Sequence, residues 1–225
     1  MISFLEFFVR YFPDLLSGIG MTLLLTAEGI LAGLVLGLAA TLARTYGGKF
    51  WRSLAIAYIE LFRGTPLLVQ LFLLYYGLPG LGIALSREWS AFLALGLNSG
   101  AYQAEYLRGS ILAVGEEQML AARAIGMSKW QAIFYIILPQ ALRLAIPAWA
   151  NEPVSLLKAS SVVFLIAVPE LMTRAKMIAS RTYDPIRSYL AAAVLYLILV
   201  YLVDAAMKWL EQHTRLPGLS QARQK

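Results

Sequence analysis

The 225-residue sequence contains no cysteine and a single histidine. Without cysteine there is no disulfide framework, no thiol nucleophile and no thiolate metal site. The histidine, His213, lies in the polar C-terminal tail, which excludes a histidine-based metal cluster or catalytic triad. A phosphate-binding loop is also missing, because the Gly48 and Lys49 pair is followed by Phe50 and lacks the spacing and hydroxyl of that motif.

Charged residues are scarce: they make up 14% of the chain, against 60% hydrophobic residues. Soluble domains carry about 25% charged residues, so the composition predicts an all-α polytopic membrane protein. The net charge of +6 suits basic cytoplasmic loops and requires no nucleic-acid partner.

Five apolar stretches are long enough to cross a membrane, which takes about 20 residues. We place them at 18–43, 54–78, 89–112, 139–168 and 189–209 within a transmembrane domain at 18–212, followed by a cytoplasmic tail at 213–225. The first loop carries Arg44, Lys49 and Arg52 without an acid, which predicts a cytoplasmic loop and an outside N-terminus. Because five spans place the two termini on opposite sides, the C-terminus is expected in the cytoplasm.

Residues 1–17 form an aromatic N-terminal segment. Its large apolar side chains recur at helical spacing at Phe4, Phe7, Phe8, Tyr11, Phe12 and Leu15. Such a stripe is typical of a helix lying in the membrane interface, and it equally suits a helix packed against the first span.

Residues 121–139, AARAIGMSKWQAIFYIILP, read as a polar-then-apolar helical hairpin within a hairpin region at about 116–138. Ala121 and Ala122 give a smooth surface able to lie in a groove. Gly126 can take the left-handed conformation that closes a helix, and Ser128 can cap the next one. Pro139 marks where a further helix begins.

Several spans are interrupted. Gly29, Gly33 and Gly37 recur at four-residue steps, which favours close approach of a second helix, most simply one of the same chain. In the second span, Thr65 as cap and Pro66 as first-turn residue predict a helix that breaks and restarts. Broken helices at membrane depth are tolerated where they are buried or line a cavity.

Polar residues inside the spans are costly and mark candidate sites. Asn98, Tyr102 and Glu105 form a stripe on one face of the third span, and Glu152 and Ser155 lie in the fourth span beside Pro153. Thr65 and Gln70 flank the break in the second span.

The hairpin resembles the coupling loop of permease subunits of bacterial ABC importers over 19 residues, with Leu120 where the family motif usually has a glutamate. Residues 59–72 and 151–171 resemble permeases for polar amino acids. The resemblance implies a type I ABC importer transmembrane domain in the bacterial inner membrane. It also implies ATPase coupling through Ala121, Ala122, Gly126, Ser128 and Pro139.

The implied partners are two ATP-binding cassette ATPase subunits, a second permease copy or paralogue, an extracytoplasmic amino-acid-binding protein and membrane lipid. ATP and Mg²⁺ would be bound by the ATPase, and no cofactor by this chain. The protein is therefore expected to be a transport subunit and not an enzyme.

Glu152 has two main interpretations, besides a purely family-framework role. As a ligand it would meet the side chain of a basic amino acid such as arginine, lysine or histidine. Paired with Lys158 or Arg143 it would be structural, and a neutral polar substrate such as glutamine would be favoured. Further candidate substrate contacts are Asn98, Tyr102, Thr65, Gln70 and Ser155.

Two other classes of function are possible. A self-standing secondary transporter would normally show repeated halves, and the sequence has no internal repeat. An intramembrane enzyme would need a nucleophile and a base, and a Ser155 and Lys158 dyad is poorly spaced on a helix.

Overall fold

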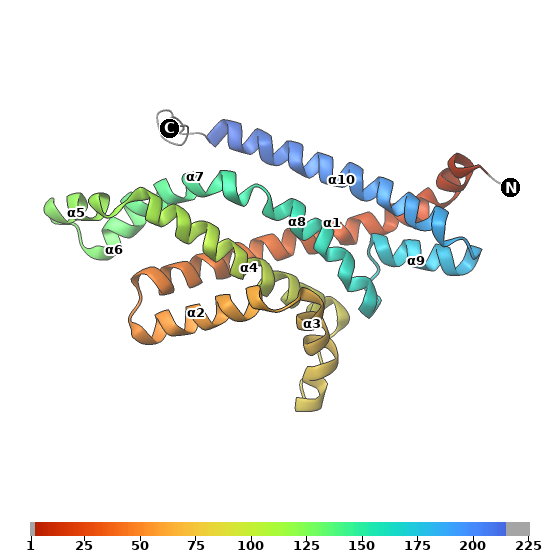
Figure 1. Ribbon diagram of the computed structural model, residues 1–225, viewed down its shortest axis with the longest axis horizontal. Coiled ribbons are helices and arrows are strands. Elements are labelled where there is room, and N and C mark those ends of the chain that lie inside the picture. Colours follow the sequence, from red (N-terminus) through yellow and green to blue (C-terminus); the bar gives the residue numbers. More distant parts are fainter. Residues whose placement is uncertain (1–2, 215–225) are drawn as a thin grey trace.

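The computed structural model describes residues 3–214, and every regular element in this range is a helix (Figure 1). The π-helices are η1 and η3, and the 3₁₀ helices are η2 and η4. In chain order the elements are α1 (Phe4–Tyr46), α2 (Lys49–Gly64), α3 (Leu67–Phe72), η1 (Leu73–Gly77), η2 (Leu78–Leu81), α4 (Arg87–Val114), α5 (Glu116–Ala124), α6 (Lys129–Gln131), η3 (Ala132–Ile137), α7 (Leu138–Trp149), α8 (Glu152–Ala159), η4 (Ser160–Ile166), α9 (Leu171–Thr182) and α10 (Pro185–Thr214). The predicted all-α class is confirmed. Of the predicted tail at 213–225, only His213 and Thr214 lie within the described residues, at the end of α10.

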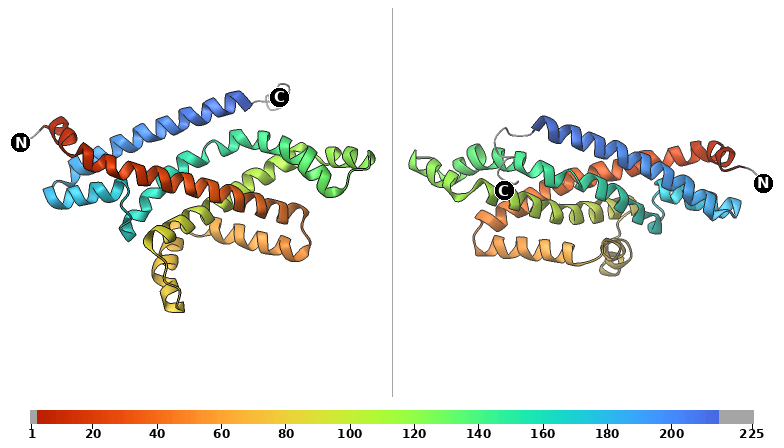
Figure 2. Two further views of the ribbon diagram at one scale, coloured as in Figure 1. Left: turned by 180° about the vertical axis from the view of Figure 1, so that it is seen from behind. Right: turned by 45° about the horizontal axis from the view of Figure 1, so that its top comes forward.

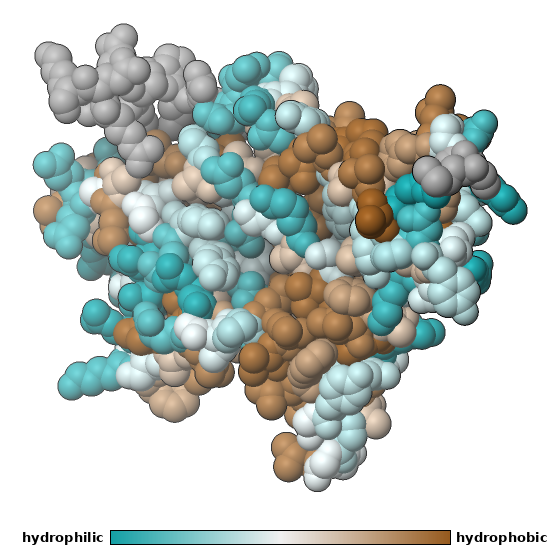
Figure 3. Space-filling model, turned by 45° about the vertical axis from the view of Figure 1, so that its right-hand side comes forward, coloured by the Kyte–Doolittle hydropathy of each residue, from teal (hydrophilic) through white to brown (hydrophobic). Residues whose placement is uncertain are grey.

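The long helices run along one common axis, so the molecule has two distinct ends (Figures 1 and 2). One end carries the turn between α1 and α2, the short helices α5 and α6, and the last turns of α10. The other end carries the first turns of α1 and the turn between α9 and α10. Figure 3 shows apolar surface gathered in the middle of the molecule and hydrophilic surface toward the ends, as a membrane protein requires.

Three helical stretches in the described part of the chain are long and apolar enough to cross a membrane: Phe4–Tyr46, Lys129–Trp149 and Pro185–Thr214. The number rises to five if each of two bent pairs counts as one span, Lys49–Gly64 with Leu67–Leu81 and Glu152–Ile166 with Leu171–Thr182. The predicted span at 89–112 is not among them. It lies in α4, which at 28 residues is about 42 Å long but more polar. This helix packs between α1, α2 and α7, so protein covers much of its polar surface.

The N-terminal aromatic segment belongs to α1, which runs without interruption through the predicted boundary at residue 17. Ser3 and Glu6 form a capping box that starts the helix. Phe7 and Leu15 are buried in an apolar cluster with residues of α9 and α10, whereas Phe4 and Phe12 are exposed. The buried part of this aromatic stripe therefore packs against α9 and α10 of the same chain.

The glycines of α1 face helices of the same chain, as predicted. A Cβ atom on Gly33 would lie 2.6 Å from Nε2 of Gln103, and one on Gly37 would lie 3.0 Å from the backbone nitrogen of Ala104. One on Gly29 would lie 2.8 Å from Leu156. A side chain on Gly33 or Gly37 would meet the backbone of α4, so these two glycines allow α4 to lie directly against α1.

The second span breaks where predicted, but the cap is placed differently. α2 ends at Gly64, and Leu67–Leu81 turns away from it by 106°, so that α3 projects from the bundle (Figure 1). Pro66, in extended conformation, is the residue before α3, so the helix restarts one residue later than predicted. Assigning Thr65 as the cap of the new helix was wrong: its hydroxyl donates to the Leu61 carbonyl of α2 at 2.7 Å.

The fourth span begins earlier than predicted. The helix starts after Ser128 and continues through η3 and α7 to Trp149, so Pro139 lies inside a helical stretch and does not begin a new one. The π-helical turns of η3 directly precede it, where a proline without an N–H group leaves the regular bonding pattern incomplete. Beyond Trp149 the span is interrupted before α8, and α9 lies outside every predicted span.

The close contact between Gly37 and α4 can be tested by introducing a large side chain at this glycine. We expect Gly37→Leu to destabilise the protein by about 1–3 kcal/mol, because its side chain would meet the backbone of α4. Gly20→Leu is the matched control, since Gly20 lies on the same helix and a Cβ atom there would have no neighbouring atom within 4 Å. Thermal unfolding of both purified variants in detergent gives the comparison, and equal loss of stability would contradict a tight contact at Gly37.

Candidate functional site

The hairpin between α5 and α6 closes with the turn that its glycine predicts. Gly126 has a φ of +89°, which is the left-handed region. Its N–H donates to the Arg123 carbonyl and the N–H of Met127 donates to the Ala122 carbonyl, both at 3.1 Å. These two bonds form the Schellman arrangement that ends a helix. The prediction for Gly126 is confirmed.

Ser128 starts the returning helix. Its hydroxyl accepts the N–H of Gln131, and the Gln131 side chain accepts the N–H of Ser128 at 2.8 Å, which completes a capping box. The local cap predicted for Ser128 is therefore confirmed. Because both ends of the turn are fixed by local bonds, the hairpin has a defined shape.

The exposed surface of the hairpin includes small and apolar residues next to charged ones such as Arg123 and Lys129. Ala121, Gly126 and Ser128 are exposed, and Leu120 and Ile125 are 67% and 78% exposed. Ala122 is 4% exposed and faces inward. Pro139 is exposed but lies farther along the chain, in α7. The hairpin stands at the end of the molecule that also carries the turn between α1 and α2 (Figure 2).

The second candidate region lies within the bundle, where three predicted substrate contacts form one cluster around the break in the second span. Gln70 donates from Nε2 to the Phe62 carbonyl at 2.8 Å and to the carbonyl and hydroxyl of Thr65 at 3.0 and 2.9 Å. Asn98 donates to the Phe62 carbonyl at 3.2 Å and to Oε1 of Gln70 at 3.1 Å. These amides satisfy the carbonyls that the break leaves without helical partners.

Glu152 belongs to a different cluster, between α4 and α8. It is 5% exposed, and Oε1 accepts the Ser99 hydroxyl at 2.7 Å. Oε2 accepts the Tyr106 hydroxyl at 3.4 Å. Gln103 extends the cluster, because it donates to the Ser99 hydroxyl at 3.0 Å and accepts the indole N–H of Trp149 at 2.8 Å. All the hydrogen-bond donors to Glu152 within residues 3–214 are neutral groups.

Tyr102 and Ser155 lie outside both clusters. Tyr102 is half-buried, with the Arg63 guanidinium carbon 5.5 Å from the centre of its ring. Ser155 is exposed on α8. The structure thus brings together Thr65, Gln70 and Asn98 and places Glu152, Tyr102 and Ser155 separately.

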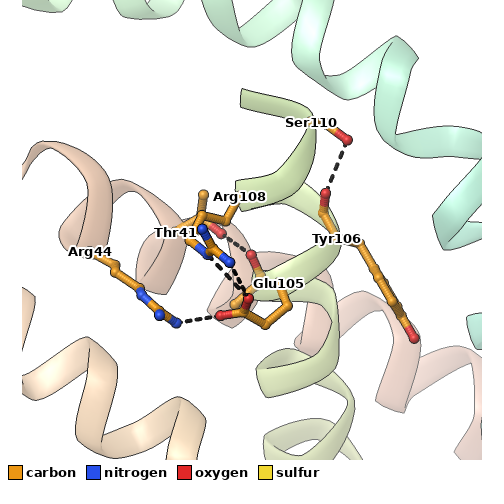
Figure 4. A network of polar contacts seen from close by, with 7 residues as sticks. Thr41, Arg44, Glu105, Tyr106, Arg108 and Ser110 are labelled. Atoms are coloured by element: carbon orange, nitrogen blue, oxygen red, sulfur yellow. Dashed lines mark hydrogen bonds and ion pairs between the residues drawn. The ribbon is translucent and has the colours of Figure 1, made fainter. Parts of the chain in front are cut away.

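Glu105, the third member of the predicted polar stripe, is held by two cations (Figure 4). Arg44, in the last turn of α1, binds Oε1, and Arg108 binds Oε2 at 2.7 Å. Beside them the Thr41 hydroxyl donates to the Ala104 carbonyl at 2.8 Å. This carboxylate is therefore engaged in holding α1 and α4 together.

Three residues that surround Glu152 were not predicted from the sequence: Ser99, Gln103 and Tyr106. They stand at i, i+4 and i+7 on α4, one residue along from Asn98, Tyr102 and Glu105. The same periodicity that identified the first stripe could have identified the second. Among residues 3–214, no group of three histidine, cysteine or acidic side chains could hold a metal ion.

Comparison with known proteins identifies the family. A family model described as "Binding-protein-dependent transport system inner membrane component" matches residues 29–216. The chain is 43% identical over 188 residues to the probable amino-acid ABC transporter permease protein YckA of Bacillus subtilis (strain 168), covering 84% of this chain and 83% of YckA. It is 34% identical over 206 residues to the glutamine transport system permease protein GlnP of Escherichia coli (strain K12), covering 91% of this chain and 94% of GlnP.

A solved structure of an amino acid ABC transporter with histidines superposes on this one with a TM-score of 0.86 at 37% identity, covering 95% of this chain and 99% of that chain. The expected type I ABC importer fold is thereby confirmed, and the two rival classes, secondary transporter and intramembrane enzyme, are set aside. The chain belongs to the family of inner membrane components of binding-protein-dependent transport systems, as the non-catalytic permease subunit of an amino-acid ABC importer whose ATPase is a separate subunit.

Proposed function

We propose that this permease subunit carries a polar, basic amino acid through a pathway that passes Glu152. The observation that carries the proposal is the lack of a counter-charge: within residues 3–214, the carboxylate is paired with the neutral hydroxyls of Ser99 and Tyr106 and with no cation. A buried charge without a partner is costly, and a cationic substrate would supply the missing charge.

The structural alternative has less support. Neither Lys158 nor Arg143 forms an ion pair with Glu152 in the described part of the chain, and both side chains are exposed. Glu152 begins α8 directly after the interruption that follows Trp149. Since it is almost fully buried, a substrate would reach it by separation of α8 from α4 at this interruption.

Relatives support both kinds of polar substrate. The solved transporter at 37% identity was crystallised with histidines, which favours a basic passenger, and GlnP is a glutamine permease, which favours a neutral one. In our proposal Asn98, Gln70 and Thr65 contact the head group of the amino acid. They would exchange their present bonds to backbone carbonyls for bonds to substrate. Tyr102 and Ser155 are further proposed contacts.

The hairpin is the proposed docking site for the ATPase, through the surface formed by Ala121, Gly126 and Ser128. Ala122 supports it from inside and Pro139 from α7. ATP and Mg²⁺ would be held by two ATPase subunits, with no cofactor in this chain. A second permease copy or paralogue and an extracytoplasmic binding protein complete the proposed importer.

The proposed orientation follows from the hairpin. The turn between α1 and α2 and the last turns of α10 lie at the same end of the molecule as the hairpin (Figure 1). If the hairpin meets a cytoplasmic ATPase, the C-terminus is cytoplasmic and the N-terminus lies outside the bacterial inner membrane.

Removing the charge of Glu152 tests the substrate proposal. We expect Glu152→Gln to lower uptake of labelled arginine by at least tenfold, equivalent to about 1.4 kcal/mol, and to lower uptake of glutamine less. The variant keeps the shape and hydrogen bonding of the side chain while deleting its charge. Uptake is measured in vesicles containing the ATPase and the binding protein, at matched levels of permease.

Glu28→Gln is the matched control, because it also deletes a carboxylate within a membrane-spanning helix, here α1, in a groove whose lining does not include Glu152. It should leave the ratio of arginine to glutamine uptake unchanged. A uniform loss for both amino acids in Glu152→Gln would indicate a framework role and would refute charge recognition.

The docking proposal is tested at Gly126. A β-branched side chain is strained at positive φ, at a cost of about 1–3 kcal/mol, so Gly126→Val should distort the turn and prevent co-purification of the ATPase. Gly48→Val is the control, because Gly48 is exposed near the same end at a φ of −67° with open space around it. Normal recovery of the ATPase with Gly126→Val would count against docking at the hairpin.

A further inference from the structure

The hairpin formed by residues 116–131 has one side-chain hydrogen bond to another part of the described chain. Lys129 donates from Nζ to the Tyr46 carbonyl at 2.9 Å, and its ammonium lies 5.6 Å from the centre of the Tyr46 ring. The other side-chain hydrogen bonds of the hairpin stay within it, and α5 packs chiefly on η3. Within residues 3–214, Lys129 is therefore its one polar tether to α1.

Tyr46 is a favourable anchor for a cation. It is the last residue of α1, where helical carbonyls lack intrahelical partners and the helix dipole attracts positive charge. Its ring also packs against an apolar cluster that includes Ile111 of α4, Ile137 of η3 and Ala141 of α7. A force on Lys129 is thus applied to the end of α1, on the side where Tyr46 contacts α4, η3 and α7.

The surroundings of the tether are loosely packed. A cavity of about 470 Å³ lies between α5 and the ends of α1 and α4, lined by Tyr46, Ile111, Met119, Leu120 and Arg123 among others. At its edge the Thr45 hydroxyl is buried without a hydrogen-bond partner among the described residues. Gly115, at a φ of +83°, joins α4 to α5. Without the hydrogen bond from Lys129, the hairpin has space to move into this cavity while α1 stays in place.

We propose that Lys129 is a positioning residue that transmits movement of the hairpin to α1. Arg44, which binds Glu105 of α4, lies two residues before Tyr46, so the tether also leads to the contact between α1 and α4. This inference rests on the ATPase docking proposed above. Docking itself would require the surface formed by Ala121, Gly126 and Ser128, whereas transmission would require the contact between Lys129 and Tyr46.

Pulsed electron paramagnetic resonance on the complex with its ATPase tests the proposal. The chain has no native cysteine, so spin labels at Gln118→Cys in α5 and Gly48→Cys beside the end of α1 are specific, and both sites are exposed. Labelled permease is diluted with unlabelled permease, so that distances within one chain are measured. With Lys129 present we expect the same distance without nucleotide and with ATP and vanadate.

In Lys129→Met, which keeps an unbranched side chain one atom shorter and removes the ammonium group, the distance should change when ATP and vanadate are added. The ATPase should stay bound and continue to hydrolyse ATP, while uptake of labelled arginine and glutamine falls about fivefold or more. Lys129→Arg, which retains a donor and the charge, should restore the fixed distance. Tyr46→Phe should behave as wild type, since the carbonyl and the ring remain.

A distance in Lys129→Met that stays fixed on addition of ATP would overturn the proposal. Loss of the ATPase from this variant would also overturn it, because Lys129 would then build the docking surface and not transmit its movement. Failure of docking at the hairpin has a different signature, namely normal co-purification with Gly126→Val. The two proposals therefore fail separately.

Discussion

The close contact between α1 and α4 is the constraint on which the other features of this fold depend. Gly33 and Gly37 present no side chain to α4, so the Gln103 amide reaches the Ile30 carbonyl at 3.1 Å and the Thr41 hydroxyl reaches α4 in the same way. Helices at this separation leave no room for lipid between them. As a result α4 can be rich in polar residues and still lie in the middle of a membrane bundle.

At the breaks in the helices, hydrogen bonds from side chains replace the backbone hydrogen bonds that are lost. Gln70 and Asn98 satisfy the carbonyls of Phe62 and Thr65 at the first break, and buried Glu170 accepts the N–H groups of Met172 and Thr173 at the start of α9. Hydrocarbon offers no such partners, so a break in a span requires polar side chains nearby. Polar residues inside the spans therefore mark either a pathway or a repaired backbone, and sequence alone does not separate these roles.

Features fixed by local chemistry could be predicted from the sequence, and features fixed by distant contacts could not. The turn at Gly126 and the cap at Ser128 depend on a few neighbouring residues, and both were predicted correctly. Thr65 was misplaced because the extended Pro66 delays the restart of the second span by one residue, and Pro139 was misplaced because the helix that starts after Ser128 continues through it. The sequence shows two polar stripes on α4, one beginning at Asn98 and one at Ser99. It does not show which of them faces Glu152, because that depends on how α8 packs against α4.

α4 connects the surroundings of Glu152 with those of the hairpin through two adjacent residues, Glu105 and Tyr106. Tyr106 donates to Glu152, and the neighbouring Glu105 holds Arg44 at the end of α1, two residues from the anchor of the hairpin. Rotation of α4 would change both contacts together, since Glu105 and Tyr106 are adjacent residues of this helix. If ATPase binding alters the surroundings of Glu152 by this route, substrate at Glu152 must alter ATPase binding by the same free energy. Any coupling between the two proposed sites would therefore act in both directions.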